Sequence, residues 1–486
     1  MKQLNIGWST MDITPDRPFF VAGQLYTRIS SYVHDPLTAT ALVLENGEEQ
    51  MTFVSLDMVS APIYVVERVW ELLKNVAEID EKRVDFHAIH THNSCTFGPV
   101  GNETLIKYFG EDRVLPIDMP EDILYGDEAT EWIAQRLYQL ILDAWDNRKP
   151  GGISYAEDYA AVGFNRRPIF KKEDGTEESK MYGDCSLDSF VRFEGPVDHT
   201  ADVLYTWDLD RNLTGVAVDI PCPSQVMELH CFVSADYWAP TRARIREELG
   251  NIYVLPMCGA GGDQNPLDLT RISKNNKKEL ILWNAQATEV FRNFDLAQEC
   301  DMIGSRITDA VVRCYPKARD SIQKAPVFHS KAVELELPIR KVDKEEYEEA
   351  AAFLAEEKEK FSKEKPMTTH DQLRMFEPMG VAERWEEQQN TDTCTFRMYV
   401  VRIGRAAIIT NPFELFVDYG VRVRARCKAD QVFHIQLANG SLGYLPTRAA
   451  VAGGSYSSKP ASTTVGPEGG DILAEKMIAE IDAMWK

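Results

Sequence analysis

The sequence has no long apolar run. Among its 486 residues, no stretch approaches the roughly 18 consecutive apolar residues of a membrane-spanning helix. The first residues, MKQLNIGWSTMDITPDRP, contain one lysine and no apolar segment long enough for a signal peptide. These absences predict a cytoplasmic protein that does not span a membrane.

The sequence has fewer basic than acidic side chains. The chain has 53 Lys and Arg residues against 76 Asp and Glu residues, which gives a net charge of −23. So negative a balance argues against binding nucleic acid or anionic membranes through general electrostatics. It leaves room for a small basic pocket, so we expect a small-molecule substrate, no nucleic acid partner and no membrane partner. No feature of the sequence predicts the oligomeric state.

Paired cysteine motifs are also missing. Nine cysteines are scattered along the chain, an odd number, and no two are spaced as CxxC. The absence of CxxC pairs argues against a zinc ribbon. Without an export signal, we expect the cysteines to be reduced thiols.

What the sequence does have is an alternation of strands and helices. TATALVLENGEEQMTFVSLDMV predicts a hairpin that turns at Asn46-Gly47, and a helix follows from about Ile63 to Val76. RVDFHAIHTHN is the next predicted strand, and GVAVDIPCPS and NIYVLPMCGAGGDQNP predict two more buried strands. The strand–helix–strand order indicates an α/β core with parallel neighbours.

One segment, at about residues 342–384, is charged and helical in pattern. We interpret it as a solvated helical insertion with no chemical role. Strands return in FRMYVVRIGRAAIITNPFE and DQVFHIQLANGSLGYLP. Because both ends of the chain contribute the same kind of strand, we predict a single catalytic domain over residues 1–486 that carries this insertion.

Three of the nine histidines lie within VDFHAIHTHNSC. Residues two apart on a strand face the same way, so His90 and His92 are predicted to project from one face. Such a pair can ligate one metal ion, or it can divide into a ligand and a proton-transfer group. His87 has the opposite parity and is predicted to be structural.

Other polar residues also stand where a buried strand meets a loop: Asp57, Cys222, Asp263 with Asn265, and Glu414. Loops at strand ends are where α/β proteins usually bind ligands. Each residue taken alone fits a turn or a cap equally well. Because several such residues follow buried strands, we expect them to converge on one ligand-binding site.

The chain resembles the catalytic domain of the neutral ceramidases, and in particular shorter bacterial ceramidase-like proteins, from about Ile6 to its end. The motifs that carry the resemblance, in order, are IGWSTMDITP, HDPLTATALVLENG, FVSLDMV, IHTHNS, VGFNRRP, GPVD, VSADYW, GAGGDQNP, NPFELF and LANGSLGYLPTRAAVAGGSY. The resemblance implies an α/β fold of two mixed β-sheets flanked by helices. It also implies a zinc hydrolase with one Zn²⁺ per chain, for which another divalent metal can substitute.

The resemblance further implies roles for individual residues. The zinc ligands would be His90, the residue at the position of Cys222, Glu414 and Tyr444. His92 would transfer protons, while Arg166 and Tyr456 would hold the substrate. Zinc with an open coordination position activates water and polarises a carbonyl, and a nearby imidazole can then serve the leaving group.

Two departures from the family pattern bear on function. Cys222 stands where the family has a histidine, so it is either a thiolate ligand or a small buried residue. We also expect neither the C-terminal sandwich domain nor the export signal of true ceramidases. The predicted substrate is therefore a small soluble amide or ester rather than membrane ceramide.

Two other functions remain open at this point. A barrel amidohydrolase also begins with an HxH pair, although the remaining histidines do not follow its pattern. A metal-free binding protein on a ceramidase-like scaffold is the other alternative. Metal analysis separates this alternative from a zinc hydrolase.

Overall fold

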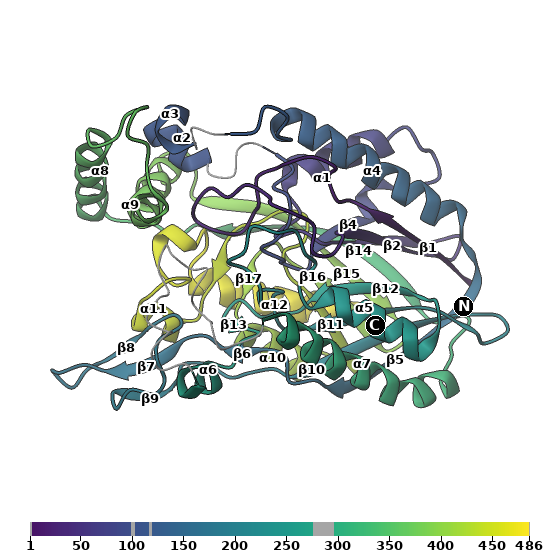
Figure 1. Ribbon diagram of the computed structural model, residues 1–486. Coiled ribbons are helices and arrows are strands. Elements are labelled where there is room, and N and C mark those ends of the chain that lie inside the picture. Colours follow the sequence, from purple (N-terminus) through teal and green to yellow (C-terminus); the bar gives the residue numbers. More distant parts are fainter. Residues whose placement is uncertain (1, 99–102, 116–118, 276–295, 486) are drawn as a thin grey trace.

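Two mixed β-sheets lie face to face, and helices cover the outer face of each (Figure 1). This computed structural model describes residues 2–98, 103–115, 119–275 and 296–485. The predicted fold class, two mixed sheets flanked by helices, is confirmed. In the described part of the chain, no helix combines the length and apolarity needed to cross a membrane.

The larger sheet has eight strands in the order β12-β11-β10-β5-β1-β2-β3-β4. Their bounds are β1 Leu4–Asp12, β2 Thr38–Glu45, β3 Gln50–Leu56, β4 Val84–Ala88, β5 Lys149–Tyr159, β10 Thr200–Asp208, β11 Leu213–Ile220 and β12 Tyr253–Cys258. The predicted hairpin at Asn46-Gly47 joins β2 to β3. The pairs β3–β4 and β11–β12 are parallel, as the strand–helix–strand pattern predicted.

The smaller sheet has the order β14-β15-β16-β18. Its strands are β14 Phe328–Pro338, β15 Thr393–Ile403, β16 Ala406–Thr410 and β18 Gln431–Ile435. β16 and β18 are parallel, and the other neighbours are antiparallel. Both sheets therefore contain parallel pairs whose carboxyl ends can present loops.

Alternate residues of the strands pack into different layers. Trp8, Leu42 and Phe53 of the larger sheet meet Tyr399 and Phe433 of the smaller one in an apolar layer between the sheets. Their chain neighbours point outward to the helices, because successive side chains of a strand face opposite sides. Burial on both faces explains why these strands are almost continuously apolar.

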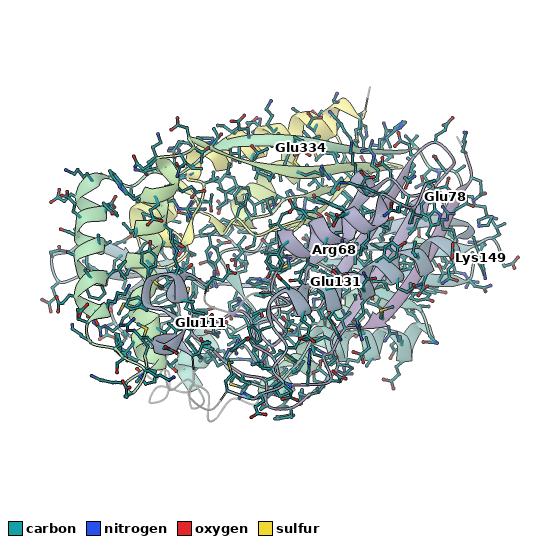
Figure 2. All side chains as sticks on the ribbon, turned by 90° about the horizontal axis from the view of Figure 1, so that it is seen from above. Arg68, Glu78, Glu111, Glu131, Lys149 and Glu334 are labelled. Carbon is teal, nitrogen blue, oxygen red and sulfur yellow. The ribbon has the colours of Figure 1, made fainter. Side chains whose placement is uncertain are left out.

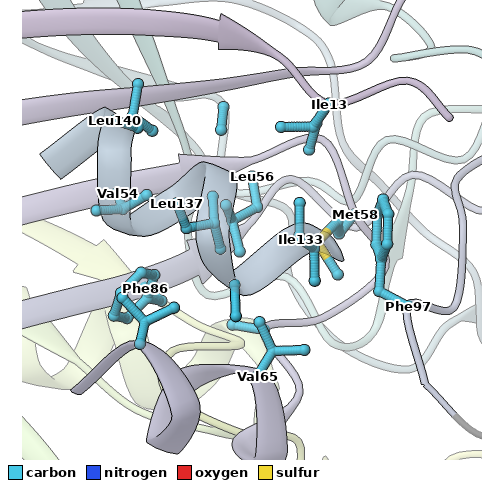
Figure 3. Packing of buried hydrophobic residues seen from close by; sticks show 14 of the residues in the cluster. Ile13, Val54, Leu56, Met58, Val65, Phe86, Phe97, Ile133, Leu137 and Leu140 are labelled. Atoms are coloured by element: carbon cyan, nitrogen blue, oxygen red, sulfur yellow. The ribbon is translucent and has the colours of Figure 1, made fainter. Parts of the chain in front are cut away.

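Helices close the outer faces. One half of the larger sheet is covered by α1 (Ile63–Leu73) and α4 (Gly126–Asp146). Its other half is covered by α5 (Trp238–Leu249) and α7 (Leu296–Asp320). The smaller sheet is covered by α10 (Val417–Arg426) and α12 (Pro467–Ala483). Figure 3 shows Val54, Leu56 and Phe86 of the strands beside Ile133 and Leu137 of α4.

The outer surface is rich in charged side chains (Figure 2). Arg68 of α1 and Glu131 of α4 form an ion pair of 2.8 Å between these two helices. Both side chains are more than a third exposed. Exposed pairs contribute roughly 0–1 kcal/mol, so the apolar layer beneath is what holds the helices to the sheet.

A group of four helices lies at one end of the molecule, and we call it the helical arm (Figure 1). It consists of α2 (Glu103–Phe109), α3 (Glu111–Val114), α8 (Lys344–Lys358) and α9 (Thr369–Gln388), which share a small apolar cluster of their own. Capping boxes at Asp343 and Thr368 start α8 and α9. The predicted insertion is thus helical, although its last helix runs to Gln388.

The remaining elements are short. A three-stranded sheet is formed by β7 Pro168–Lys171, β8 Glu177–Ser179 and β9 Phe190–Phe193, and two-residue strands pair as β6 Phe164–Asn165 with β13 Gln264–Asn265 and β17 Glu414–Leu415 with β19 Tyr444–Leu445. The short helices are α6 Leu269–Asn275, α11 Arg448–Gly453, and the 3₁₀ turns at Glu81–Arg83 and Pro460–Ser462.

A buried acid lies where the two sheets meet. Asp202 of β10 accepts a hydrogen bond of 2.7 Å from Gln431 of β18, and its carboxylate lies 3.8 Å from the guanidinium of Arg424. Burial raises the pKa of Asp202 to about 7, because the distant Arg424 only partly offsets the loss of water.

This acid should make stability depend on pH. The folded protein holds a proton on Asp202 that the unfolded chain releases near pH 4, so the free energy of unfolding should fall as the pH rises from about 4 to 7. A shift of about 3 pKa units corresponds to a change of roughly 4 kcal/mol in the free energy of unfolding.

The variant Asp202→Asn keeps an acceptor for Gln431 and removes the titrating group. In urea unfolding we expect a smaller loss of stability between pH 5 and pH 8 for Asp202→Asn than for the wild type. Asp210→Asn, in an exposed turn, is the control; equal losses in all three proteins would contradict the assignment.

Candidate active site

Loops from both sheets meet at the carboxyl ends of the parallel strands. The loop after β4 carries His90 and His92, and the Ser224 N–H in the loop after β11 donates to the Ile89 carbonyl at 3.1 Å. β17 follows β16 and β19 follows β18, and these two short strands pair so that Glu414 stands opposite Tyr444. Side chains from distant parts of the sequence are thereby brought together.

His90 lies beyond the end of β4, at φ 66°. The prediction that His90 and His92 project from one strand face is therefore wrong, because β4 ends at Ala88 and the left-handed backbone of His90 turns the chain. The two rings nevertheless converge, with 3.3 Å between their Nε2 atoms. His90 Nδ1 lies 2.6 Å from the Val59 carbonyl oxygen and so carries a proton, while Nε2 lies 3.2 Å from Glu414 Oε2.

His92 is held from both sides of its ring. Its Nδ1 lies 3.1 Å from Glu228 Oε2, and its Nε2 lies 2.6 Å from Gln225 Nε2, which donates to it. Because Gln225 Nε2 is a donor, its contact requires a lone pair on Nε2 of His92, which assigns the proton of the neutral ring to Nδ1. Burial lowers the pKa of His92, which favours the neutral imidazole. Gly23 packs against the ring so closely that a Cβ there would lie 2.4 Å from Cγ of His92.

Arg166 follows β6 and is fully buried beside the two tyrosines. Its guanidinium donates to the Gly262 carbonyl at 2.9 Å and lies 5.1 Å from the centre of the Tyr444 ring. The ring of Tyr456 meets that of Tyr444 edge-on at 5.4 Å. Burial would lower the pKa of Arg166, but Tyr444 and the other acidic groups around it raise the pKa above its usual value, so the guanidinium stays charged.

Glu414 remains ionised in spite of its burial. Burial pushes the pKa of Glu414 upward, but His90 and Arg166 outweigh it and hold the pKa below its usual range. The side chain of Tyr444 hydrogen-bonds to Glu414 as well. Burial raises the pKa of Tyr456 to about 12, so its hydroxyl keeps its proton and can donate.

Several of these residues line a cavity of about 240 Å³, and His90 and Glu414 lie behind its wall. Its polar wall includes His92, Arg166, Gln225, Glu228, Tyr444 and Tyr456, and its apolar wall includes Met181, Leu229 and Leu373. Leu373 belongs to α9 of the helical arm. The insertion thus contributes an apolar residue to the cavity wall, and its expected lack of a chemical role stays a prediction.

Other strand-end residues have structural partners. Asp57 forms a bidentate ion pair with Arg242 of α5 at 2.6 and 2.8 Å. Asp263 accepts a hydrogen bond from the N–H of Val417 at the start of α10 and another from Asn165. His87 contacts Asp85 at 2.8 Å, in agreement with its predicted structural role. These residues hold the loops in place rather than line the cavity.

Cys222 is buried in the apolar cluster beneath the helices α5 and α7. Its thiol lies 3.5 Å from the Pro223 carbonyl oxygen. Burial raises the pKa of the Cys222 thiol well above its usual value. Within the described residues, no three or more His, Cys, Asp and Glu side chains form a group that could hold a metal ion.

The cavity residues that were not predicted from the sequence include Gln225, Glu228 and Leu373. The first two follow Cys222 in the loop after β11, and no motif marks them. Their place in the loop after β11, which already carried the predicted candidate Cys222, was the one sequence feature that could have pointed to them. Leu373 had no signal at all, because its helix has the composition of a solvated element.

Comparisons with known proteins bear on the fold. No protein-family model matches the chain, and no curated protein matches it. Two solved structures are similar over 100% of this chain. Neutral ceramidase from Pseudomonas aeruginosa has a TM-score of 0.68 and 16% identity, with 75% of that chain covered. A ceramidase complexed with C2 has a TM-score of 0.65 and 15% identity, with 76% of that chain covered. The protein therefore has the fold of neutral ceramidase, as its sequence motifs predicted.

Proposed function

We propose that this protein is a metal-dependent amidase-type hydrolase that acts on small amides or esters. The observation that carries the proposal is that His90 Nε2 lies 3.2 Å from Glu414 Oε2 and 3.3 Å from His92 Nε2, beside a cavity that His92 lines. Likeness to the ceramidase fold at 16% identity supports amide chemistry only as an analogy.

The residues present fit a divalent metal ion. His90 Nε2 lies 3.2 Å from the Glu414 carboxylate, so this contact needs a positive charge between the two atoms. The charge is either the proton of a charged His90, the state in which His90 lowers the pKa of Glu414, or a metal ion bound in place of that proton. His90, Glu414 and Tyr444 would hold the ion. Zinc bound there would supply a Lewis acid that polarises the scissile carbonyl and lowers the pKa of water.

His92 is placed to move protons. Its Nε2 lies 3.3 Å from Nε2 of His90 and accepts a hydrogen bond from Gln225, so the Gln225 amide must give way before this nitrogen takes a proton. Glu228 contacts the opposite nitrogen and fixes the orientation of the ring. A neutral imidazole can take a proton from water and return it to the leaving amine or alcohol. Glu228 stabilises the imidazolium that exists between these two transfers.

Arg166 and Tyr456 are placed to bind the reacting carbonyl. Both line the cavity, and Nε of Arg166 has no protein partner although it is buried. A charged donor aimed at a developing oxyanion stabilises the transition state more than the ground state. Neither residue has to ionise for this role.

The small cavity favours small substrates. Cavities for drug-sized ligands are roughly 300–1,000 Å³, and here the space is about 240 Å³ with α9 lying over it. Gln372 of α9 accepts from the N–H of Thr27 at 2.9 Å, and the ring of Phe376 packs 5.7 Å from that of Tyr456. These contacts hold the helical arm over the cavity and leave little room for a long acyl chain.

One observation favours a second candidate, a metal-free binding protein. His90 and Glu414 would form a simple ion pair if Nε2 of His90 carried a proton, and no group of three His, Cys, Asp or Glu side chains is assembled within the described residues. A barrel amidohydrolase is excluded, because the larger sheet is mixed and open, not a closed barrel of parallel strands.

Metal content should identify the ligands. Protein purified without chelator should contain about one zinc per chain by elemental analysis, and Glu414→Gln should lose most of it. We leave Cys222 outside the proposed set because its thiol lies in the apolar cluster, although Cys222 as a ligand remains a prediction from the sequence. Cys222→Ala should therefore keep its zinc. A loss as large as that of Glu414→Gln would make Cys222 the fourth ligand, and zinc-free wild-type protein would favour the binding-protein alternative.

Removing the proton-transfer group should separate catalysis from metal binding. His92→Ala should keep its metal and lower kcat by roughly 100-fold or more, the scale expected for a general acid–base group. The measurement is kcat with a short-chain 4-nitrophenyl ester, together with elemental analysis of the same preparation. Loss of metal from His92→Ala would instead identify His92 as a ligand.

The position of Leu373 should limit substrate length. Wild-type kcat/KM should fall steeply along a series of 4-nitrophenyl esters of increasing acyl length, and Leu373→Ala should shift the optimum towards longer chains. Leu354→Ala is the matched control, because Leu354 lies in the apolar cluster of the helical arm and does not line the cavity. An unchanged length profile in Leu373→Ala would show that α9 does not limit the substrate.

A further inference from the structure

The loop after β11 leaves two oxygen atoms without a protein partner. They are Oε1 of Gln225 and Oε1 of Glu228, and both atoms are buried. Gln225 is 1% exposed and Glu228 is 6% exposed, and both residues line the cavity. A buried acceptor without a donor is costly, and a buried carboxylate is more so.

The orientation of both side chains is fixed by the same neighbour. Nε2 of Gln225 donates to one nitrogen of His92, and Oε2 of Glu228 contacts the other. Gln24 also donates to Glu228 Oε2, at 3.4 Å. Each side chain therefore uses one polar atom to hold its place, and its Oε1 is left buried without a protein partner in a residue that lines the cavity.

The carboxylate of Glu228 makes no hydrogen bond with the arginine beneath it, although the charge of Arg28 is close enough to act on Glu228. Arg28 lies under this loop, but its guanidinium donates to the backbone carbonyls of Ala22, His92, Glu228 and His230. Among the described residues, the ion-pair contact that Glu228 makes is the one with His92. The cavity thus has an acceptor wall at Gln225 and Glu228, in addition to the donor Arg166.

We propose that Gln225 and Glu228 bind a protonated amino group of the substrate. This inference rests on the proposed hydrolase function and narrows its substrates to small amides or esters that carry a primary ammonium close to the scissile carbonyl. An ammonium supplies three donors and a positive charge, which matches two acceptors of which one is anionic. A hydroxyl supplies one donor and no charge, and a carboxylate would be repelled by Glu228.

The test measures binding, so it needs no turnover. The probes are N-acetylethylenediamine, which is cationic, N-acetylethanolamine, its neutral analogue of the same length, and N-acetylglycine, which is anionic. In isothermal titration calorimetry we expect the wild type to bind the cationic probe at least about 10-fold more tightly than the neutral one, a difference of roughly 1.4 kcal/mol. N-acetylglycine should bind more weakly than the cationic probe.

Glu228→Gln should reduce the preference for the cation to about 2-fold or less. Glu377→Gln is the matched control, since it removes the same charge from the exposed surface of α9, where Glu377 pairs with Lys459; it should keep the preference. Equal binding of the cationic and neutral probes by the wild type, tighter binding of the anionic probe, or no binding of the cationic probe would each overturn the proposal. These measurements on the wild-type protein test the amine site even if Glu228→Gln does not fold.

The two proposals fail in different ways. A protein that prefers the cationic probe but hydrolyses no amide or ester keeps the amine site and loses the hydrolase function. A protein that hydrolyses neutral short-chain esters but shows no preference among the probes keeps the hydrolase function and loses the amine site.

Discussion

The site depends on the apolar layer between the two sheets. Residues such as Phe53 of the larger sheet and Phe433 of the smaller one are fully buried there, and their packing sets how the sheets lie on each other. Polar contacts fix the register at the edge, where Asn439 bonds to both the Phe86 N–H and the Asp85 carboxylate. As a result, the loop after β4 meets Glu414 and Tyr444, which come from more than 300 residues further along the chain.

This layer also explains why polar residues at the strand ends have two kinds of role. Asp57, Asp263 and His87 each bond to a neighbouring element and hold the loops against the sheets. His92 is then free to face the cavity, with His90 beside it, because other residues already satisfy the backbone around them. A site assembled from several loops needs such supporting residues, since a loop alone does not hold a side chain in a fixed direction.

Much of the scaffold could be predicted from the sequence. The hairpin at Asn46-Gly47, α1 and the parallel pairs β3–β4 and β11–β12 depend on local patterns, which a sequence displays directly. The ordered motifs predicted the fold. The left-handed backbone at His90 could not be predicted, because nothing about histidine requires it. The strand β4 was therefore predicted to continue past Ala88, where it ends. Gln225, Glu228 and Leu373 were missed because their importance comes from contacts with distant residues.

The helical arm has a consequence for how such a protein can change over time. Its helices pack on their own apolar cluster, and α9 reaches the cavity through a side chain that takes no part in the chemistry. Substitutions in the arm can therefore alter which molecules enter while leaving the reacting groups untouched. Changes in the shape of the cavity and changes in its polar residues can therefore arise almost independently of each other in proteins that share this fold.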